Sequence, residues 1–221
     1  GLKIKKIFLL KTLSFIQVLF LLPACSFKNQ TDSNYYCQKL KFNCVRVNKK
    51  VNFKTSKGNF EIQLFGKDNP VTVSNFLENI DKNIYVNQKF YKIIEYGQIR
   101  LIHGGVNPGN KFYTERNQTF NKIISSIPLE IKFKEEIEPR YNYQIKNPDE
   151  TKDLKNTFEK GSIAMAKSGN IKSSSTEFFF VTNNIQALDG RYSIFGKITK
   201  GFDVIKEIRK GDYVMEVNIS N

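Results

Sequence analysis

The stretch of residues 161–198 constrains the fold more than any other part of the chain. It contains three strand-like runs, at residues 162–166, 177–182 and 192–198, separated by polar loops that contain glycine. Short strands that follow one another in this way predict a mainly β domain. With 221 residues, the chain is long enough for one such domain with a sizeable core.

The middle run carries three consecutive phenylalanines, Phe178, Phe179 and Phe180. Successive side chains of a strand point to opposite faces of a sheet. We therefore expect Phe178 and Phe180 to share one face, and Phe179 to point the other way, as a pocket residue would.

Upstream, the sequence predicts a hairpin followed by a helix. Residues 51–65 form two strand-like runs around a turn at residues 56–59, with alternating apolar residues at 60–64. Apolar residues then recur at helical spacing over residues 71–80, and Pro70 stands where a first helical turn tolerates proline.

Seven short motifs stand in order between residues 51 and 219. They read NPVTVSNFL from Asn69, FYKII from Phe90, HGG from His103, IPLE from Ile127, AMAKSG from Ala164, TEFFF from Thr176 and LDGRYSIFGKI from Leu188. Together they resemble the motifs of the cyclophilin family of peptidyl-prolyl cis-trans isomerases, which are A-P-x-T-V-x-N-F, F-H-R-V-I, Q-G-G, I-P-x-E, S-M-A-N-A-G, S-Q-F-F-I and L-D-G-x-H-x-V-F-G-x-V.

The resemblance implies a closed antiparallel eight-stranded barrel, capped by two α-helices near residues 71–80 and 202–209. This cyclophilin-like domain would span residues 51–221. The resemblance also implies an enzyme that isomerises X-Pro bonds of proline-containing polypeptides, with no cofactor or metal. The barrier, roughly 18–20 kcal/mol, comes from amide resonance, so the site must favour the twisted amide over the planar one.

The family binds the proline ring in an apolar pocket and places a donor beside the amide that loses resonance. Carried over by position, the retained pocket residues are Phe90, Phe179 and Leu188. Leu101 replaces a methionine of the pocket, and Ala166 corresponds to a residue that contacts the substrate backbone.

Four polar positions depart from the family pattern. Lys92 replaces the catalytic arginine and becomes the expected electrophilic donor, without the planar fork of a guanidinium. His103 and Glu177 replace two glutamines, and Tyr192 replaces a histidine of the pocket. These substitutions lead us to expect weak turnover.

The chain is also longer than the family pattern between Lys92 and His103. We expect residues 95–98 to form a larger turn there. Arg100, which stands where the family has a pocket phenylalanine, is a candidate for supplying the missing guanidinium from a new direction, although strand alternation could equally direct it to solvent.

Two functions therefore remain open. The first is an isomerase with Lys92 as donor and Phe90, Leu101, Phe179 and Leu188 around the proline. The second is a non-catalytic module that binds proline peptides or acts like a chaperone on the same fold.

The N-terminus indicates export. Only 16 uncharged residues lie between Lys11 and Lys28, fewer than the ~20 of a spanning helix, so residues 1–24 are interpreted as a signal peptide. Leu-Pro-Ala-Cys at residues 22–25 resembles a bacterial lipobox and predicts lipidation of Cys25. The protein would then be an exported lipoprotein anchored in a bacterial membrane, with residues 25–50 as a polar lead-in. The alternative is an uncleaved signal anchor with an incidental cysteine.

Two further cysteines, Cys37 and Cys44, lie in the lead-in. Export would permit a disulfide between them, and two unpaired thiols are the alternative. With one histidine in the chain, His103, the cysteine pair does not suggest zinc.

The net charge is +14, and loss of residues 1–24 with their four lysines would leave about +10. Because the basic residues are scattered, no specific nucleic-acid partner is expected. Attraction to anionic lipid headgroups and a simply solvated basic surface both account for the charge. We expect a monomer.

Overall fold

The computed structural model describes residues 32–106 and 126–220. The described strands are β1 Lys49–Thr55, β2 Gly58–Leu64, β3 Lys92–Tyr96, β4 Ile99–Gly104, β5 Ser126–Pro128, β6 Glu130–Ile131, β7 Arg140–Tyr141, β8 Ser162–Gly169, β9 Lys172–Val181, β10 Ile194–Lys200 and β11 Val214–Ser220. The α-helices are α1 Ser33–Leu40, α2 Pro70–Asp81 and α4 Phe202–Glu207, and the 3-10 helices are η1 Pro148–Asp153 and η2 Gln186–Leu188.

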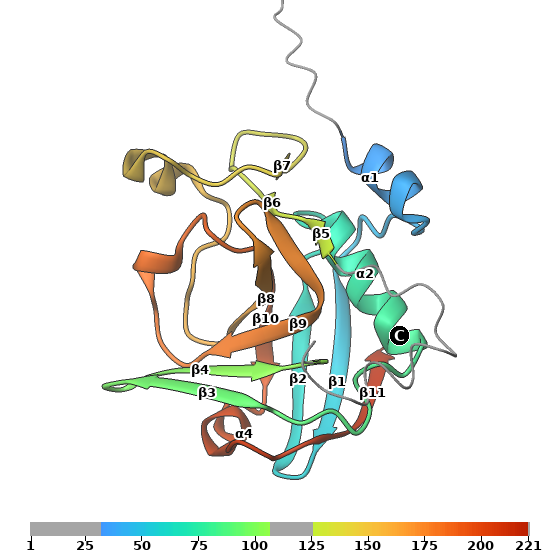
Figure 1. The fold of residues 1–221 in the computed structure, drawn as a ribbon, viewed down its shortest axis with the longest axis vertical. Helices are drawn as coiled ribbons and strands as arrows, with labels where there is room; N and C mark the ends of the chain where they lie inside the picture. The colour runs from blue at the N-terminus through green and yellow to red at the C-terminus, as the bar shows by residue number, and fades with distance from the viewer. Residues whose placement is uncertain (1–31, 107–125, 221) are drawn as a thin grey trace, which may run out of the picture.

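One curled antiparallel sheet dominates the molecule (Figure 1). Its strand order is β11-β1-β2-β10-β8-β9-β4-β3, with β5 paired to β9, while β6 and β7 form a separate small ribbon. The expected mainly β, antiparallel architecture is confirmed. The closed barrel is not, because the hydrogen-bonded order ends at β11 and β3.

The chain just before these two end strands joins them. Phe90 donates its N–H to the carbonyl of Asp212 at 2.7 Å and accepts from the N–H of Gly211 at 2.9 Å. Lys89 and Tyr213 form an isolated bridge beside them. The half-barrel is therefore drawn together by a short backbone contact instead of a continuous ladder.

Aromatic side chains fill the interior of the curled sheet. The rings of Phe53 and Phe60, on β1 and β2, stack with centroids 4.8 Å apart. Phe76 of α2 packs against Phe178 at 5.7 Å, and Phe180 is fully buried in the same cluster. The predicted split of the three phenylalanines is confirmed, because Phe179 belongs to a different cluster on the other face.

Helix α2 covers one opening of the half-barrel and confirms the helix predicted near residues 71–80 (Figure 1). Its first turn is held by the carboxyl of Glu130, which accepts the N–H of Val71 at 3.1 Å and that of Thr72 at 2.8 Å. The hydroxyl of Tyr141 donates to the same carboxyl at 2.8 Å. Such donors favour the ionised form at a helix N-terminus, but full burial outweighs them and raises the pKa of Glu130 to about 7.

The segment expected as a polar lead-in contains α1, which packs beside α2. The hydroxyl oxygen of Ser33, at the start of α1, lies 2.6 Å from that of Tyr141. The Cys37–Cys44 disulfide closes the end of this helix, with Cα atoms 5.5 Å apart. Of the two alternatives for these cysteines, the structure contains the bridge.

The expected signal peptide, residues 1–24, and Cys25 lie outside the described residues. Within residues 32–106 and 126–220, no helix has the length and apolar character needed to cross a membrane.

The pKa of Glu130 predicts how stability depends on pH. The folded-state pKa is about 7, against 4.5 for the free side chain, so the unfolded chain loses its proton first as the pH rises. The free energy of unfolding should therefore fall between about pH 4.5 and 7.5, by on the order of 3 kcal/mol at most from this group. Glu130→Gln should flatten that slope in urea titrations. An exposed control, Glu216→Gln on β11, should keep the wild-type slope, and an equal slope in all three proteins would contradict the prediction.

Candidate active site

One row of side chains crosses five strands on the outward face of the sheet. The strand register places Lys92 of β3 opposite His103 of β4, and His103 opposite Phe179 of β9. Ala164 of β8 follows Phe179, and Ile194 of β10 follows Ala164. Because directly opposed residues share a face, the cation, the imidazole and the apolar residues adjoin one another.

The apolar part of this row is the Phe179 cluster. Its buried members are Phe158, Ala164, Phe179, Val181 and Ile194, and its half-buried members are Leu101, Ile185, Leu188 and Tyr192. The structure thus brings together four of the predicted site residues, Leu101, Phe179, Leu188 and Tyr192. With Phe179 only 1% exposed, the half-buried residues form the part of the cluster that a ligand can reach.

Ring contacts hold Phe179 in place. Its ring stacks on that of Phe158 at 5.7 Å and on His103 at 5.2 Å. Tyr192 meets it edge-on at 5.2 Å. These arrangements are favourable aromatic geometries, so three rings together orient the ring of Phe179.

His103 is neutral at physiological pH. Burial, with a smaller contribution from the charge of Lys92, lowers the pKa of its imidazole to about 4. Its Nε2 atom is buried and has no hydrogen-bond partner within the described residues. Polar atoms buried in this way are uncommon in native proteins.

Lys92 is exposed and points from the edge strand of the sheet. Throughout residues 32–106 and 126–220, no carboxylate pairs with it and no group accepts a hydrogen bond from it. Its ammonium is therefore free to act on a bound group.

Glu177, by contrast, is already engaged. The hydroxyl of Tyr91 donates to its carboxylate at 2.6 Å. Burial, followed by the neighbouring Glu177, raises the pKa of Tyr91 above its usual range. The sequence reasoning gave Tyr91 no role, although its place between Phe90 and Lys92, where the family has histidine, was a signal.

Two of the predicted site residues, Ala166 and Phe90, lie outside the Phe179 cluster. Ala166 falls where the β8–β9 register shifts between Met165 and Lys167, so it has no partner in that ladder. Phe90 does not join the Phe179 cluster, because its fully buried ring belongs to the interior cluster on the other side of the sheet.

Arg100 cannot replace the family arginine. It shares a face of the hairpin with Glu95, whose carboxylate it contacts at 2.8 Å, and that face is opposite to the one carrying Leu101 and His103. Its remaining nitrogens donate to the carbonyls of Lys206 and, at 2.8 Å, Ile208. The guanidinium therefore fastens β4 to the end of α4.

The expected larger turn at residues 95–98 is also wrong. Tyr96 pairs directly with Ile99, so Gly97 and Gln98 alone make the turn. Gly97 has φ +57°, which a two-residue hairpin turn favours and which glycine adopts without strain. The additional residues lengthen the two strands instead of the loop.

Sequence reasoning missed Phe158, which lies outside the recognised motifs. Its backbone N–H donates to the carboxylate of Asp189 at 2.7 Å. Asp189 belongs to the Leu-Asp-Gly motif, and burial raises the pKa of its carboxyl. That motif therefore positions both Leu188 and the ring that supports Phe179.

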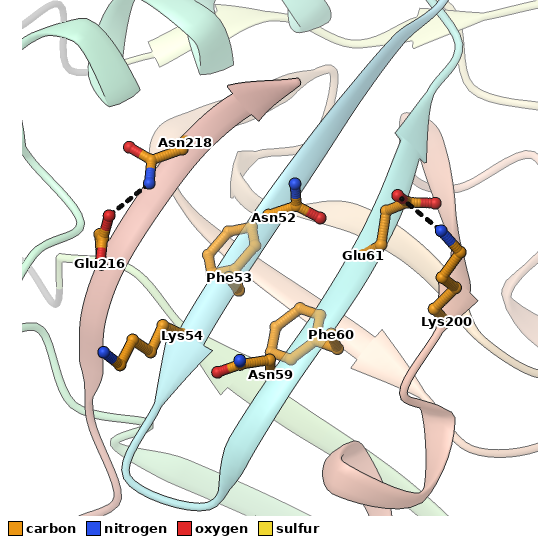
Figure 2. A pocket seen from close by; sticks show the side chains of 9 residues that line it. All are labelled: Asn52, Phe53, Lys54, Asn59, Phe60, Glu61, Lys200, Glu216 and Asn218. Carbon is orange, nitrogen blue, oxygen red and sulfur yellow. Dashed lines mark hydrogen bonds and ion pairs between the residues drawn. The ribbon is translucent and has the colours of Figure 1, made fainter. Parts of the chain in front are cut away.

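A separate hollow lies on the outer face of β1, β2, β10 and β11 (Figure 2). Its volume is about 450 Å³, and it shares no residue with the Phe179 cluster. Two of the carboxylates at its rim have local partners: Glu61 pairs with Lys200 at 3.4 Å, and Glu216 accepts from Asn218.

The fold and the outward cluster define a half-barrel with an apolar site that lies beside Lys92. The model of the cyclophilin type peptidyl-prolyl cis-trans isomerase family matches residues 50–221. The chain therefore belongs to that family and to its class of enzyme.

Individual relatives agree. A peptidyl-prolyl cis-trans isomerase of Helicobacter pylori is 28% identical over 174 residues, covering 76% of this chain and 85% of the relative. One from Acinetobacter baylyi is 30% identical over 167 residues, covering 73% and 72%. A crystal structure of a Cryptosporidium parvum cyclophilin, determined in the presence of the dipeptide Ala-Pro, has a TM-score of 0.53 at 21% identity, covering 78% of this chain and 99% of that one.

The proximity of Lys92 and His103 predicts a measurable titration. His103 is the one histidine of the chain, so its NMR signal is unambiguous. We expect its pKa near 4, and a kcat/KM that shows no step between pH 5.5 and 8 because the ring stays neutral. Lys92→Gln should raise the pKa of His103 by removing the neighbouring charge. A pKa near 6.5 that Lys92→Gln leaves unchanged would show that the two side chains do not interact.

Proposed function

We propose that this protein is a monomeric isomerase of X-Pro bonds in exported or membrane-associated proteins, with turnover weakened relative to family members that carry arginine. The observation that carries the proposal is the ammonium of Lys92, which has no partner in the described part of the chain. It lies one strand from His103 and two strands from Phe179 on the same face.

The chemistry requires little more than this arrangement. The half-buried Leu101, Leu188 and Tyr192 bind the proline ring over Phe179, while Lys92 donates to the amide as its resonance is lost. The contact strengthens as the amide twists, so it lowers the barrier instead of only tightening binding. No covalent intermediate forms.

Ala166 and His103 are proposed to hold the substrate backbone. The unpaired residue at the shift in the β8–β9 register offers peptide groups to an extended chain. A peptide group of the substrate would also give the Nε2 atom of His103 the partner that it lacks.

The same geometry supports the proposed reduction in turnover. An ammonium is a compact, strongly hydrated charge and cannot donate twice in one plane as a guanidinium does. Glu177 replaces a neutral glutamine, and its carboxylate is held by Tyr91.

A second candidate is a non-catalytic module that binds proline peptides. The engaged Glu177 and the neutral His103 favour it, because neither supplies a cationic donor. The two candidates share the apolar cluster and differ in the role of Lys92.

Substitution of Lys92 distinguishes them. For an electrophilic donor, Lys92→Arg should raise kcat/KM and Lys92→Ala should lower it about tenfold or more, with smaller changes in the Kd of a proline peptide. NMR exchange between cis and trans peptide gives both quantities. Lys54→Ala, which removes an exposed lysine of β1, is the charge-matched control and should match the wild type. A wild-type rate at background level would favour the binding module.

We also propose that the protein is exported and anchored through lipid on Cys25. The basic and apolar N-terminus and the Leu-Pro-Ala-Cys order support this. The Cys37–Cys44 bridge adds support, because disulfides persist in oxidising compartments.

Mass spectrometry of the full chain from a bacterial host tests the anchor. We expect a mature N-terminus at Cys25 that carries acyl chains, in the membrane fraction. Cys25→Ala should accumulate as an uncleaved precursor, whereas Cys37→Ala should still be processed. An unmodified Cys25 or cleavage at another bond would reject the proposal.

A further inference from the structure

The β3–β4 hairpin carries an apolar strip on the same face as the candidate site. Ile94 pairs with Leu101, and Tyr96 pairs with Ile99, so all four side chains point the same way. We call these four residues the hairpin strip. Figure 1 shows the hairpin extending beyond the rest of the sheet.

The outer half of this strip is exposed to solvent. Tyr96 is 82% exposed and Ile94 is 38% exposed, two of the few large apolar side chains with such exposure in the described part of the chain. Aromatic residues exposed in a continuous apolar strip commonly mark interaction sites.

The strip is continuous with the Phe179 cluster. Leu101 belongs to both, because it packs against the cluster and pairs with Val181 of β9. Ile94 is the next residue across from Leu101, and Tyr96 lies two residues further along β3, about 7 Å away. An extended peptide with its proline over the cluster would therefore place a side chain two or three residues away over Tyr96.

The hairpin is also held in position. Arg100 binds the carbonyls at the end of α4 and the carboxylate of Glu95, on the face opposite to the strip. A rigid surface loses less entropy when a ligand binds.

We propose that the hairpin strip is a specificity site, which selects clients with a large apolar or aromatic side chain two or three residues from the proline. This inference rests on the proposed function and deepens it. Contact with a second copy is less favoured, because four side chains fall far short of the ~800 Å² that each partner buries in a stable interface. Lys92 and Glu95 on this edge strand also oppose pairing of one edge with another.

A set of peptides tests the strip. All peptides share an Ala-Pro core. In each test peptide one phenylalanine lies two or three residues before the proline, or two or three residues after it. In the reference peptide all of these positions are alanine. NMR exchange measures kcat/KM for each, and NMR titration measures each Kd. We expect the full chain to prefer at least one phenylalanine peptide by about fivefold, consistent with partial burial of one aromatic side chain.

Substitutions locate that preference. Tyr96→Thr, and independently Ile94→Thr, should reduce the ratio between the phenylalanine and alanine peptides towards one, since threonine suits an exposed strand. The control is Ile137→Thr, at a 92% exposed residue between β6 and β7, and it should keep the wild-type ratio.

The outcomes separate this inference from the proposed activity. If no peptide is isomerised but the ratio of Kd values between the phenylalanine and alanine peptides depends on Tyr96, the specificity site is supported and the proposed activity is rejected. If isomerisation occurs with no preference for a phenylalanine peptide, or with a preference that both hairpin variants retain, the proposed specificity site is rejected. A change in vesicle binding or oligomeric state without a change in selectivity would likewise overturn it.

Discussion

The alternation of side chains along β9 is the constraint on which the rest of the structure depends. Phe178 and Phe180 are locked into the interior, where Phe178 contacts Phe76 and Tyr85 at 5.7 and 5.4 Å. This contact fixes the rotation of the strand, so Phe179 must face outward. A slip of one residue would exchange the two faces and remove both the core and the site. The neighbours of β9 then decide what surrounds Phe179, since β4 and β8 lie on either side of it.

The charge of Lys92 influences the protonation of its neighbour His103. Among the described residues Lys92 has no ion-pair partner, and its charge adds to burial in keeping His103 neutral. Two positive charges on directly opposed residues would repel one another. The replacement of arginine by lysine and that of glutamine by histidine are therefore compatible, because a neutral imidazole still offers one donor and one acceptor to a peptide.

The sequence predicted those elements whose apolar period is strong. Phe178 to Phe180 and the helix near residues 71–80 are such cases, since burial on one face leaves a visible pattern. It did not predict α1, a short helix held by a disulfide and by contacts to distant residues. The two-residue turn at Gly97 was not predicted, because it depends on where the additional residues enter the ladder. For Arg100 the sequence left both orientations open, and the structure places it on the face away from the site. Phe158 was missed because its role arises from a backbone bond to Asp189, which no local period records.

If Cys25 carries lipid as proposed, the docking of α1 limits how the protein can sit at a membrane. Six residues separate Cys25 from Asp32, and a fully extended chain of this length spans about 25 Å. A domain of this size is about 40 Å across. Because this linker is short, a lipid on Cys25 would keep the α1 end close to the bilayer. The β3–β4 hairpin lies toward the other end of the molecule (Figure 1). The outward face of that hairpin would then meet chains arriving from the aqueous side, and not segments still lying in the headgroup layer.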